Sequence, residues 1–233
     1  MSILEKTNEE IINEVRSILG YDVTDPTTAL KSTWGRIVKN ASEYVKDGVV
    51  DIEKLETIYS DGDLIDYYIA TLAITSLRNR PDSLFNAIKN LKATDKVLDY
   101  GCGSGTHGIA CAEKGCEVYA VDVSKKMKDF TKARYKLYNL PVKIRSSKQK
   151  LPKNYFDFII CVDLIEHIPE PIELLRKLIG CLKQGGVLYI YGSAQVMYEK
   201  GHLPKSISLY KKVSPKIFSK RFKKVGPNSW KLL

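Results

Sequence analysis

The sequence predicts an α/β fold, a Rossmann-like doubly wound sheet of seven strands, mostly parallel with one antiparallel strand, preceded by an all-helical N-terminal extension. Three observations favour this class. From Asp95 onward, short apolar runs alternate with helical patterns, which is typical of a parallel sheet covered by helices. A glycine-rich turn directly follows the first of these runs. The last two runs are joined by Gly226-Pro227-Asn228, which is too short for a parallel crossover, so one of the two strands must be antiparallel.

The extension covers residues 1–92 and the sheet domain covers residues 93–233, as one structural unit, because no flexible linker separates them. One apolar stripe at helical spacing follows a helix cap at Thr7 or Asn8 and comprises Ile11, Ile12, Val15, Ile18 and Leu19. Further helices are expected at residues 28–46, 52–59, 64–77 and 82–91. In the sheet domain, strands are expected at residues 96–100, 117–121, 142–146, 156–162, 186–191, 221–225 and 229–233.

The segment Lys96–Ser124 has the pattern of a nucleotide-binding strand, loop, helix and strand. The segment begins with a buried apolar run. Gly101, Gly103 and Gly105 follow this run and let the backbone turn and approach a ligand closely. A helix is expected at residues 106–116. The second strand carries Asp122 at its carboxyl end, where a carboxylate can accept hydrogen bonds from both hydroxyls of a ribose. An adenosine-containing ligand is therefore expected.

Two adenosine cofactors fit this pattern. Gly103, Gly105 and Gly108 also match the G-x-G-x-x-G fingerprint of dinucleotide binding, and Asp122 lies near the expected spacing. In that alignment the first strand would have to include Asp99 and Tyr100, burying a carboxylate without an obvious partner. A loop that begins at Asp99 avoids this cost. Asp99 could then orient the loop and, directly or through water, the ammonium of an amino-acid moiety.

Four blocks in the sequence, VLDYGCGSG, EVYAVDVS, FDFIICVDLIEHIPEP and LKQGGVLYI, decide between them. In their order and spacing, over residues 91–233, the chain resembles the class I S-adenosylmethionine-dependent methyltransferases, in particular those of quinone biosynthesis (the methyltransferase type 11 group). The resemblance implies S-adenosylmethionine as cofactor. The implied cofactor-binding residues are Asp99, Gly101, Cys102, Gly103, Gly105, Thr106, His107, Asp122, Val123, Ser147, Lys148 and Asp163.

Within this set, the resemblance places the three loop glycines at the methionine end, Asp122 at the ribose and Val123 against the adenine. One departure is visible. Family members often carry an Asp shortly before a Leu-Pro pair to bind the adenine amino group, whereas Ser147 and Lys148 precede Leu151-Pro152 here. Ser147 could take over that hydrogen bond.

Candidate catalytic residues follow the fourth strand, where open α/β sheets place their ligands. Asp163, Glu166 and His167 are spaced so that a turn could bring them together. Three readings remain open: they support the cofactor loop, His167 with Glu166 acts as a base, or the three hold a divalent metal. The second reading is the basis for naming His167 and Glu166 as catalytic candidates, and no metal site is assigned. Tyr68 in the extension and His202 in the loop after the fifth strand are candidates for acceptor contact, with the extension acting as a lid.

Composition and charge limit the possible partners and location of the protein. Lysine and arginine exceed acidic residues to give a formal net charge of +10, concentrated in residues 125–153 and 200–231. Such a surface could attract RNA, although no recognised RNA-binding module is present. No apolar run approaches the roughly 20 residues of a membrane span, and no signal-peptide pattern is seen, so a cytoplasmic location is expected. The five cysteines, without a C-x-x-C pair, are expected to be reduced core residues.

The sequence therefore predicts an enzyme that transfers a methyl group from S-adenosylmethionine to a small or medium-sized acceptor and releases S-adenosylhomocysteine. The acceptor and its methylated atom are not indicated, and neither is an oligomeric state. Two alternatives remain: an RNA methyltransferase that uses the basic surface, and a nucleotide-binding protein without catalytic activity. Nucleic acid is thus an alternative partner, less favoured than a small molecule.

Overall fold

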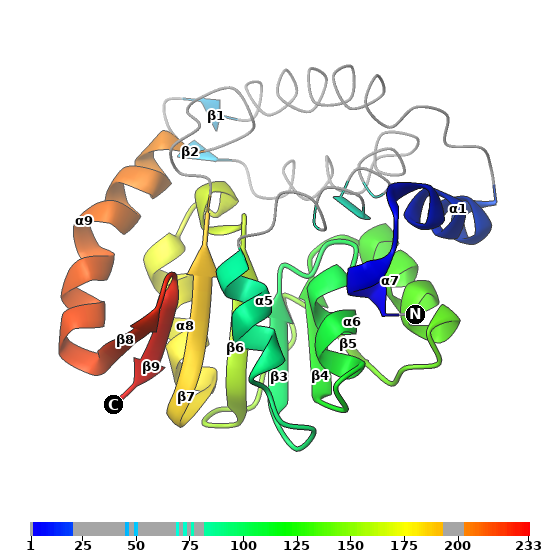
Figure 1. Ribbon diagram of the computed structural model, residues 1–233. Helices are drawn as coiled ribbons and strands as arrows, with labels where there is room; N and C mark the ends of the chain where they lie inside the picture. The colour runs from blue at the N-terminus through cyan, green and yellow to red at the C-terminus, as the bar shows by residue number, and fades with distance from the viewer. Residues whose placement is uncertain are drawn as a thin grey trace.

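The computed structural model describes residues 2–20, 45–46, 49–50, 69, 72–73, 76, 82–192 and 203–233, without the side chains of residues 45, 46, 49, 50, 204 and 205. Figure 1 shows a central sheet with helices on both of its faces. Its seven strands are hydrogen-bonded in the order β5-β4-β3-β6-β7-β9-β8. Their bounds are β3 Lys96–Tyr100, β4 Glu117–Asp122, β5 Lys143–Ser146, β6 Phe156–Val162, β7 Leu182–Tyr191, β8 Phe222–Gly226 and β9 Ser229–Leu232.

The predicted fold class is confirmed. β5, β4, β3, β6 and β7 pair in parallel, whereas β9 pairs antiparallel with both β7 and β8. The turn between β8 and β9 includes Asn228, whose φ of 56° places it in the left-handed region that asparagine tolerates. The main difference in strand length is at β7, which begins at Leu182 rather than at residue 186.

Alternation along β3 explains how the sheet is covered. Val97 packs in a core that contains Ile109 of α6 (Thr106–Ala112) and Phe130 of α7 (Lys125–Leu137). The next residue, Leu98, points to the opposite core, which contains Leu175 of α8 (Pro171–Cys181). Successive side chains of a strand face opposite sides, so a buried parallel strand must be apolar on both. The second core also includes residues of α9 (Pro204–Arg221).

The amino-terminal part packs on the first of these cores. It comprises a short 3-10 helix, η1 (Ile3–Glu5), and α1 (Asn8–Leu19), while α5 (Asp82–Lys89) leads into the sheet. Thr7 caps α1 and Gly20, with a φ of 79°, ends it. Ile11 and Val15 from the predicted apolar stripe are fully buried in the same core as Val97. The expected division at residue 92 remains a prediction.

One expectation for the extension is wrong in detail. Val45–Lys46 (β1) and Val49–Val50 (β2) form an antiparallel pair, so the helix expected at 28–46 does not include its last two residues and the extension is not all-helical. The reason is local. β-Branched valines flank Asp47-Gly48, a dipeptide that favours a two-residue hairpin turn. Ile69, Leu72, Ala73 and Ser76 are helical, as expected for 64–77. Residues 28–44, the helix expected at 52–59, and residues 64–68, 70–71, 74–75 and 77 lie outside the described part.

Within the described residues, no helix is both long and apolar enough to cross a membrane. All five cysteines are buried and none forms a disulfide. Burial raises the pKa of the Cys102 and Cys111 thiols well above the ordinary value, since the charged thiolate is poorly solvated there. These thiols therefore behave as small core residues, as expected from their spacing.

Candidate functional site

The candidate site lies at the carboxyl ends of three adjacent parallel strands, β4, β3 and β6. The chain builds β4 and β5 on one side of β3 and then places β6 on its other side, which makes the β3/β6 boundary a topological switch point. Ligands of open α/β sheets bind in the crevice at such a point. The loops after both strands meet there, because a Cβ added to Gly101 would lie 2.8 Å from Cδ2 of Leu164.

The loop after β3 has a shape that requires glycine. Gly101, Gly103 and Gly105 have φ values of 77°, 51° and 79°, in the left-handed region. The amides of Gly101 and Cys102 donate to the Val121 carbonyl oxygen at 2.9 and 3.0 Å, which ties the loop to β4. A Cβ on Gly105 would lie 2.7 Å from Cγ2 of Thr131. The loop is thus confined to one narrow path over the strand ends.

Asp122 ends β4 beside this loop, as predicted. Its Oδ2 accepts a hydrogen bond from the Gly103 amide at 3.1 Å, and its Oδ1 accepts one from the Ser124 amide at 2.9 Å. Burial raises the pKa of Asp122, although these two bonds act in the opposite direction. Each carboxylate oxygen has a second lone pair, so both can still accept a hydroxyl hydrogen bond. The geometry therefore fits a ligand with two neighbouring hydroxyl groups.

Asp99 has a different place from the one expected. β3 runs through Asp99 and Tyr100, so the argument that the loop begins at Asp99 is wrong. The buried carboxylate does have a partner: its Oδ2 accepts from the Gly108 amide at 3.0 Å. Burial raises the pKa of Asp99 to about 7, with a smaller contribution in the same direction from Asp122. Asp99 thus anchors the first turn of α6, and its ammonium contact remains a prediction.

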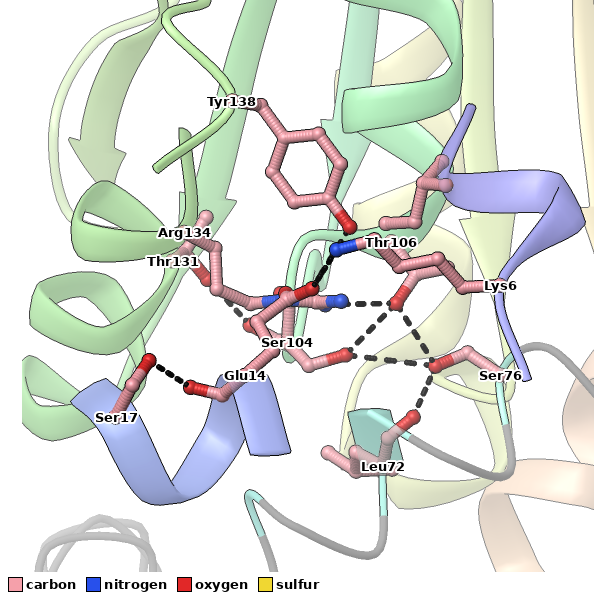
Figure 2. Close-up of polar contacts among 12 residues, drawn as sticks. Lys6, Glu14, Ser17, Leu72, Ser76, Ser104, Thr106, Thr131, Arg134 and Tyr138 are labelled. Carbon is pink, nitrogen blue, oxygen red and sulfur yellow. Dashed lines mark hydrogen bonds and ion pairs between the residues drawn. The ribbon is translucent and has the colours of Figure 1, made fainter. Parts of the chain in front are cut away.

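Residues that the sequence analysis did not single out support the loop from behind, as Figure 2 shows. Thr131 on α7 donates from Oγ1 to the Gly103 carbonyl oxygen at 2.7 Å. Arg134, one turn further, donates from Nη1 to the Ser104 carbonyl oxygen at 2.8 Å. Both side chains are fully buried. Their inward positions on α7, in phase with Met127 and Phe130, were the available sequence signal.

The helical segment that contains Leu72 and Ser76 reaches the same loop. A Cβ on Gly103 would lie 3.2 Å from Cδ1 of Leu72. Ser76 Oγ lies 3.4 Å from both Ser104 Oγ and Thr106 Oγ1, and these two hydroxyl oxygens are 3.2 Å apart. The carboxyl end of the extension therefore contacts the glycine loop directly, as Figure 2 shows for Ser76.

The residues after β6 are separated by their exposure. Asp163 is exposed in a left-handed turn, with a φ of 47°, and its amide donates to the Tyr191 carbonyl oxygen at 2.8 Å. Glu166 is buried in η2 (Ile165–His167), where its Oε2 would be 2.7 Å from a Cβ on Gly192. His167 is half-buried at the end of η2. In the part of the chain that is described, no three His, Cys, Asp or Glu side chains are arranged to hold a metal ion.

The other predicted cofactor residues lie along the same edge. Val123 and Ser147 follow β4 and β5, and the Ser147 amide donates to the Asp122 carbonyl oxygen at 3.3 Å. Val123 is 37% exposed, enough for a planar group to pack on it. Lys148 is exposed next to Ser147.

At the β3 end, Cys102 and Thr106 are buried and His107 is half-buried. Tyr68 and His202 lie outside the described residues.

A family model described as "Methyltransferase domain" matches residues 73–198, slightly more than half of the chain. The chain therefore belongs to this family of methyltransferase domains. The class predicted from the four sequence blocks, the class I S-adenosylmethionine-dependent methyltransferases, is confirmed, and so is S-adenosylmethionine as the cofactor. The family match thus favours S-adenosylmethionine over a dinucleotide. The place of Asp99 within β3 no longer supports that choice.

Individual relatives are more distant. A ubiquinone biosynthesis O-methyltransferase of Proteus mirabilis is 26% identical over 150 residues, which cover 60% of this chain and 58% of the relative. One of Coxiella burnetii is 31% identical over 96 residues, covering 40% of this chain and 41% of the relative. The chain thus spans about half the length of these curated relatives. A crystal structure of a SAM-dependent methyltransferase from Aquifex aeolicus is 23% identical, with a TM-score of 0.49 and coverage of 66% of this chain and 87% of the other.

Proposed function

We propose that this protein transfers a methyl group from S-adenosylmethionine to a small or medium-sized acceptor and releases S-adenosylhomocysteine. One observation carries the proposal: in a chain of this family, the glycine loop after β3 and the Asp122 carboxylate at the end of β4 face each other, bonded at 3.1 Å. The other predicted site residues in the described part line the same edge of the sheet.

The residues present fit the cofactor. The Gly103 amide donates to Oδ2 of Asp122 and the Ser124 amide donates to Oδ1. Each oxygen therefore keeps a lone pair that can accept a hydrogen bond from a ribose hydroxyl. The loop glycines allow the left-handed backbone path beside Asp122 along which the methionine part would lie, and the half-exposed Val123 offers a surface for the adenine. Ser147 and Lys148 are the candidates for contacts with the adenine edge, and Asp163 and His107 for the outer rim of the site.

When bound, S-adenosylmethionine supplies a methyl group that its own sulfonium already activates. The protein then has to hold the acceptor atom about 3 to 3.5 Å from that methyl, in line with the breaking bond. A base is needed only where the acceptor must lose a proton early. His167 is the better candidate because it is half-buried at the end of η2, whereas Glu166 is buried and suited to supporting the loop.

The acceptor pocket is proposed to involve Tyr68 of the extension and His202 of the loop after β7, with residues 34–80 closing over the site. The contact between Ser76 and the glycine loop supports such a closure. Similarity to ubiquinone biosynthesis O-methyltransferases makes a phenolic hydroxyl the first acceptor to test. The cytoplasmic location remains a prediction.

An activity assay tests the proposal. The protein would be incubated with S-adenosylmethionine and either small catechols or mixed RNA, and released S-adenosylhomocysteine would be measured. We expect product with at least one catechol and none above background with RNA. Methylated RNA together with inert catechols would instead support the RNA-modifying alternative.

A further inference from the structure

The amino-terminal arm, residues 2–20, reaches the back of the glycine loop through one buried ion pair (Figure 2). Glu14, in the middle of α1, accepts a hydrogen bond on Oε1 from Arg134 Nε at 2.5 Å. Arg134 also donates from Nη1 to the Ser104 carbonyl oxygen at 2.8 Å and to Thr106 Oγ1 at 2.9 Å. The side chains of Glu14 and Arg134 are 2% and 0% exposed, respectively. Charge-assisted hydrogen bonds therefore connect α1 to the loop and to the first residue of α6.

Glu14 is held as a carboxylate by more than one group. Its Oε2 accepts hydrogen bonds from Lys6 Nζ and from the Tyr138 hydroxyl, both at 2.8 Å. Burial alone would raise the pKa of Glu14, but the Arg134 charge and the bonds from Lys6, Arg134 and Tyr138 outweigh it, and the pKa is lowered. The pair is thus ionised at neutral pH, and Arg134 always has a counter-charge while α1 is in place.

The arm also holds the other end of α6. Ser2 Oγ donates to Oε2 of Glu113 at 2.5 Å, and the Ile3 amide donates to its Oε1 at 2.7 Å. Glu113 is the residue that follows α6. Between these two attachments, Ile3 and Ile11 are fully buried in the core that includes α6. The arm therefore fixes α6 at both ends. The glycine loop leads directly into the first turn of α6.

Removal of α1 would leave Arg134 in an unfavourable state. Within the described residues, Glu14 is the acid that pairs with Arg134. Arg134 Nη2 has no hydrogen-bond partner there. Removing the partner of a buried cation is strongly destabilising, because the charge is then left uncompensated in the protein interior. Arg134 would then turn toward water, and the Ser104 carbonyl and Thr106 hydroxyl would lose their donor. The shape of the loop depends on the arm for this reason.

We propose that Glu14 is a positioning residue for cofactor binding: through Arg134 it holds the glycine loop in its binding shape, so docking of the arm and binding of the cofactor favour each other. This rests on the proposed function, namely that the loop binds S-adenosylmethionine and its product. Glu14 lies outside the matched residues 73–198, whereas Arg134 and the glycine loop lie within them.

A first experiment measures affinity for S-adenosylhomocysteine by calorimetry in the Glu14→Gln variant. Glu9→Gln is the matched control, because Glu9 is exposed on the same helix and the change removes the same charge. We expect affinity to fall about tenfold in Glu14→Gln, within the usual range of coupling between sites, and to be unchanged in the control. Equal affinity in the two folded variants would overturn the inference.

A second experiment separates positioning from overall stability. Glu14→Met alone leaves Arg134 unpaired, whereas Glu14→Met with Arg134→Met removes both charges, a change that often restores stability. We expect thermal stability to recover in the double variant while S-adenosylhomocysteine affinity stays low, because Ser104 and Thr106 still lack their donor. Affinity that recovers together with stability would show a purely structural role and overturn the inference.

Coupling must also act in reverse. S-adenosylhomocysteine should slow hydrogen exchange of amides at residues 11–19 in the wild-type protein and have a smaller effect there in Glu14→Gln. If the ligand binds the wild-type protein without slowing exchange in α1, the inference is wrong and the proposed function stands. If the ligand does not bind the wild-type protein at all, the proposed function itself fails.

Discussion

At the scale of single residues, Asp122 is the side chain on which cofactor affinity should depend most. Loss of its bonds to two ribose hydroxyls should cost about 1.5 to 3 kcal/mol, which is roughly a 10- to 150-fold weaker affinity. Asp122→Asn is preferred to Asp122→Ala because it keeps an acceptor for the Gly103 or Ser124 amide. Calorimetry with S-adenosylhomocysteine checks this. Asp129→Asn, an exposed acid on α7, should bind normally, and an Asp122→Asn variant that did so too would refute the assignment.

Gly108 shows how tightly the site is packed at the start of α6. A Cβ there would lie 2.3 Å from the Tyr135 hydroxyl and 3.1 Å from Asp99 Oδ2. We therefore expect Gly108→Ala to lower the free energy of unfolding, although alanine is the better helix former. The Tyr135 hydroxyl has no hydrogen-bond partner in the described part of the chain, so adding Tyr135→Phe should recover much of the loss. Gly180→Ala, in the open part of α8, should be neutral or stabilising in the same denaturation experiment.

Asp99 gives a pH prediction with a definite sign. Its pKa, raised by burial to about 7, means that the folded protein keeps a proton that the unfolded chain releases near pH 4. The contribution of Asp99 to stability is therefore full below pH 4 and is lost as pH rises through about 7. Relative to Asp99→Asn, the wild-type protein should lose stability over this range, by about 1.4 kcal/mol per pKa unit of difference. A stability difference between the two proteins that does not vary from pH 4 to 8 would contradict the burial of an ionisable Asp99.

At the scale of elements, the sequence located the strands far better than the amino-terminal contacts. Apolar runs bounded by glycines and turns identified β3, β6 and the β8–β9 hairpin within one residue, because strand periodicity and turn chemistry are local. The ion pair between Glu14 and Arg134 joins residues 120 positions apart, and no local sequence pattern predicts it. The same holds for Asp99, whose partner is a backbone amide, a group that carries no sequence signal. Candidate site residues could thus be listed from motifs, whereas their supports could not.

The extension and the loop before α9 are the elements expected to select the acceptor. Deleting residues 1–60 would test this poorly, because it would remove Glu14 and the buried Ile3 and Ile11 together with any lid. Single changes are cleaner. Tyr68→Ala and His202→Ala should lower turnover with a catechol at least several-fold while S-adenosylhomocysteine affinity stays normal, since contacts limited to the acceptor do not touch the cofactor. Steady-state kinetics and calorimetry on the same preparations check this, and unchanged kinetics in both variants would exclude these residues from the acceptor pocket.

At the scale of the whole molecule, charge is strongly asymmetric. Every charged side chain in residues 203–233 is basic, and most lie exposed on α9 and β8. If this surface bound RNA as substrate, affinity would fall with salt at a log-log slope of about −0.7 per phosphate contact. We expect only weak, salt-labile RNA binding, and turnover of a small acceptor that is unaffected by Lys212→Glu with Lys216→Glu. Tight, sequence-dependent RNA binding at physiological salt would contradict this expectation.

The central claim, that the glycine loop and Asp122 bind S-adenosylmethionine rather than a dinucleotide, is tested most directly by one calorimetric comparison. The wild-type protein would be titrated in the same buffer with S-adenosylhomocysteine, S-adenosylmethionine and NAD. The account predicts saturable binding of the first two, at one site per chain and weakened in Asp122→Asn, and no measurable binding of NAD. Saturable NAD binding without binding of S-adenosylhomocysteine would contradict it.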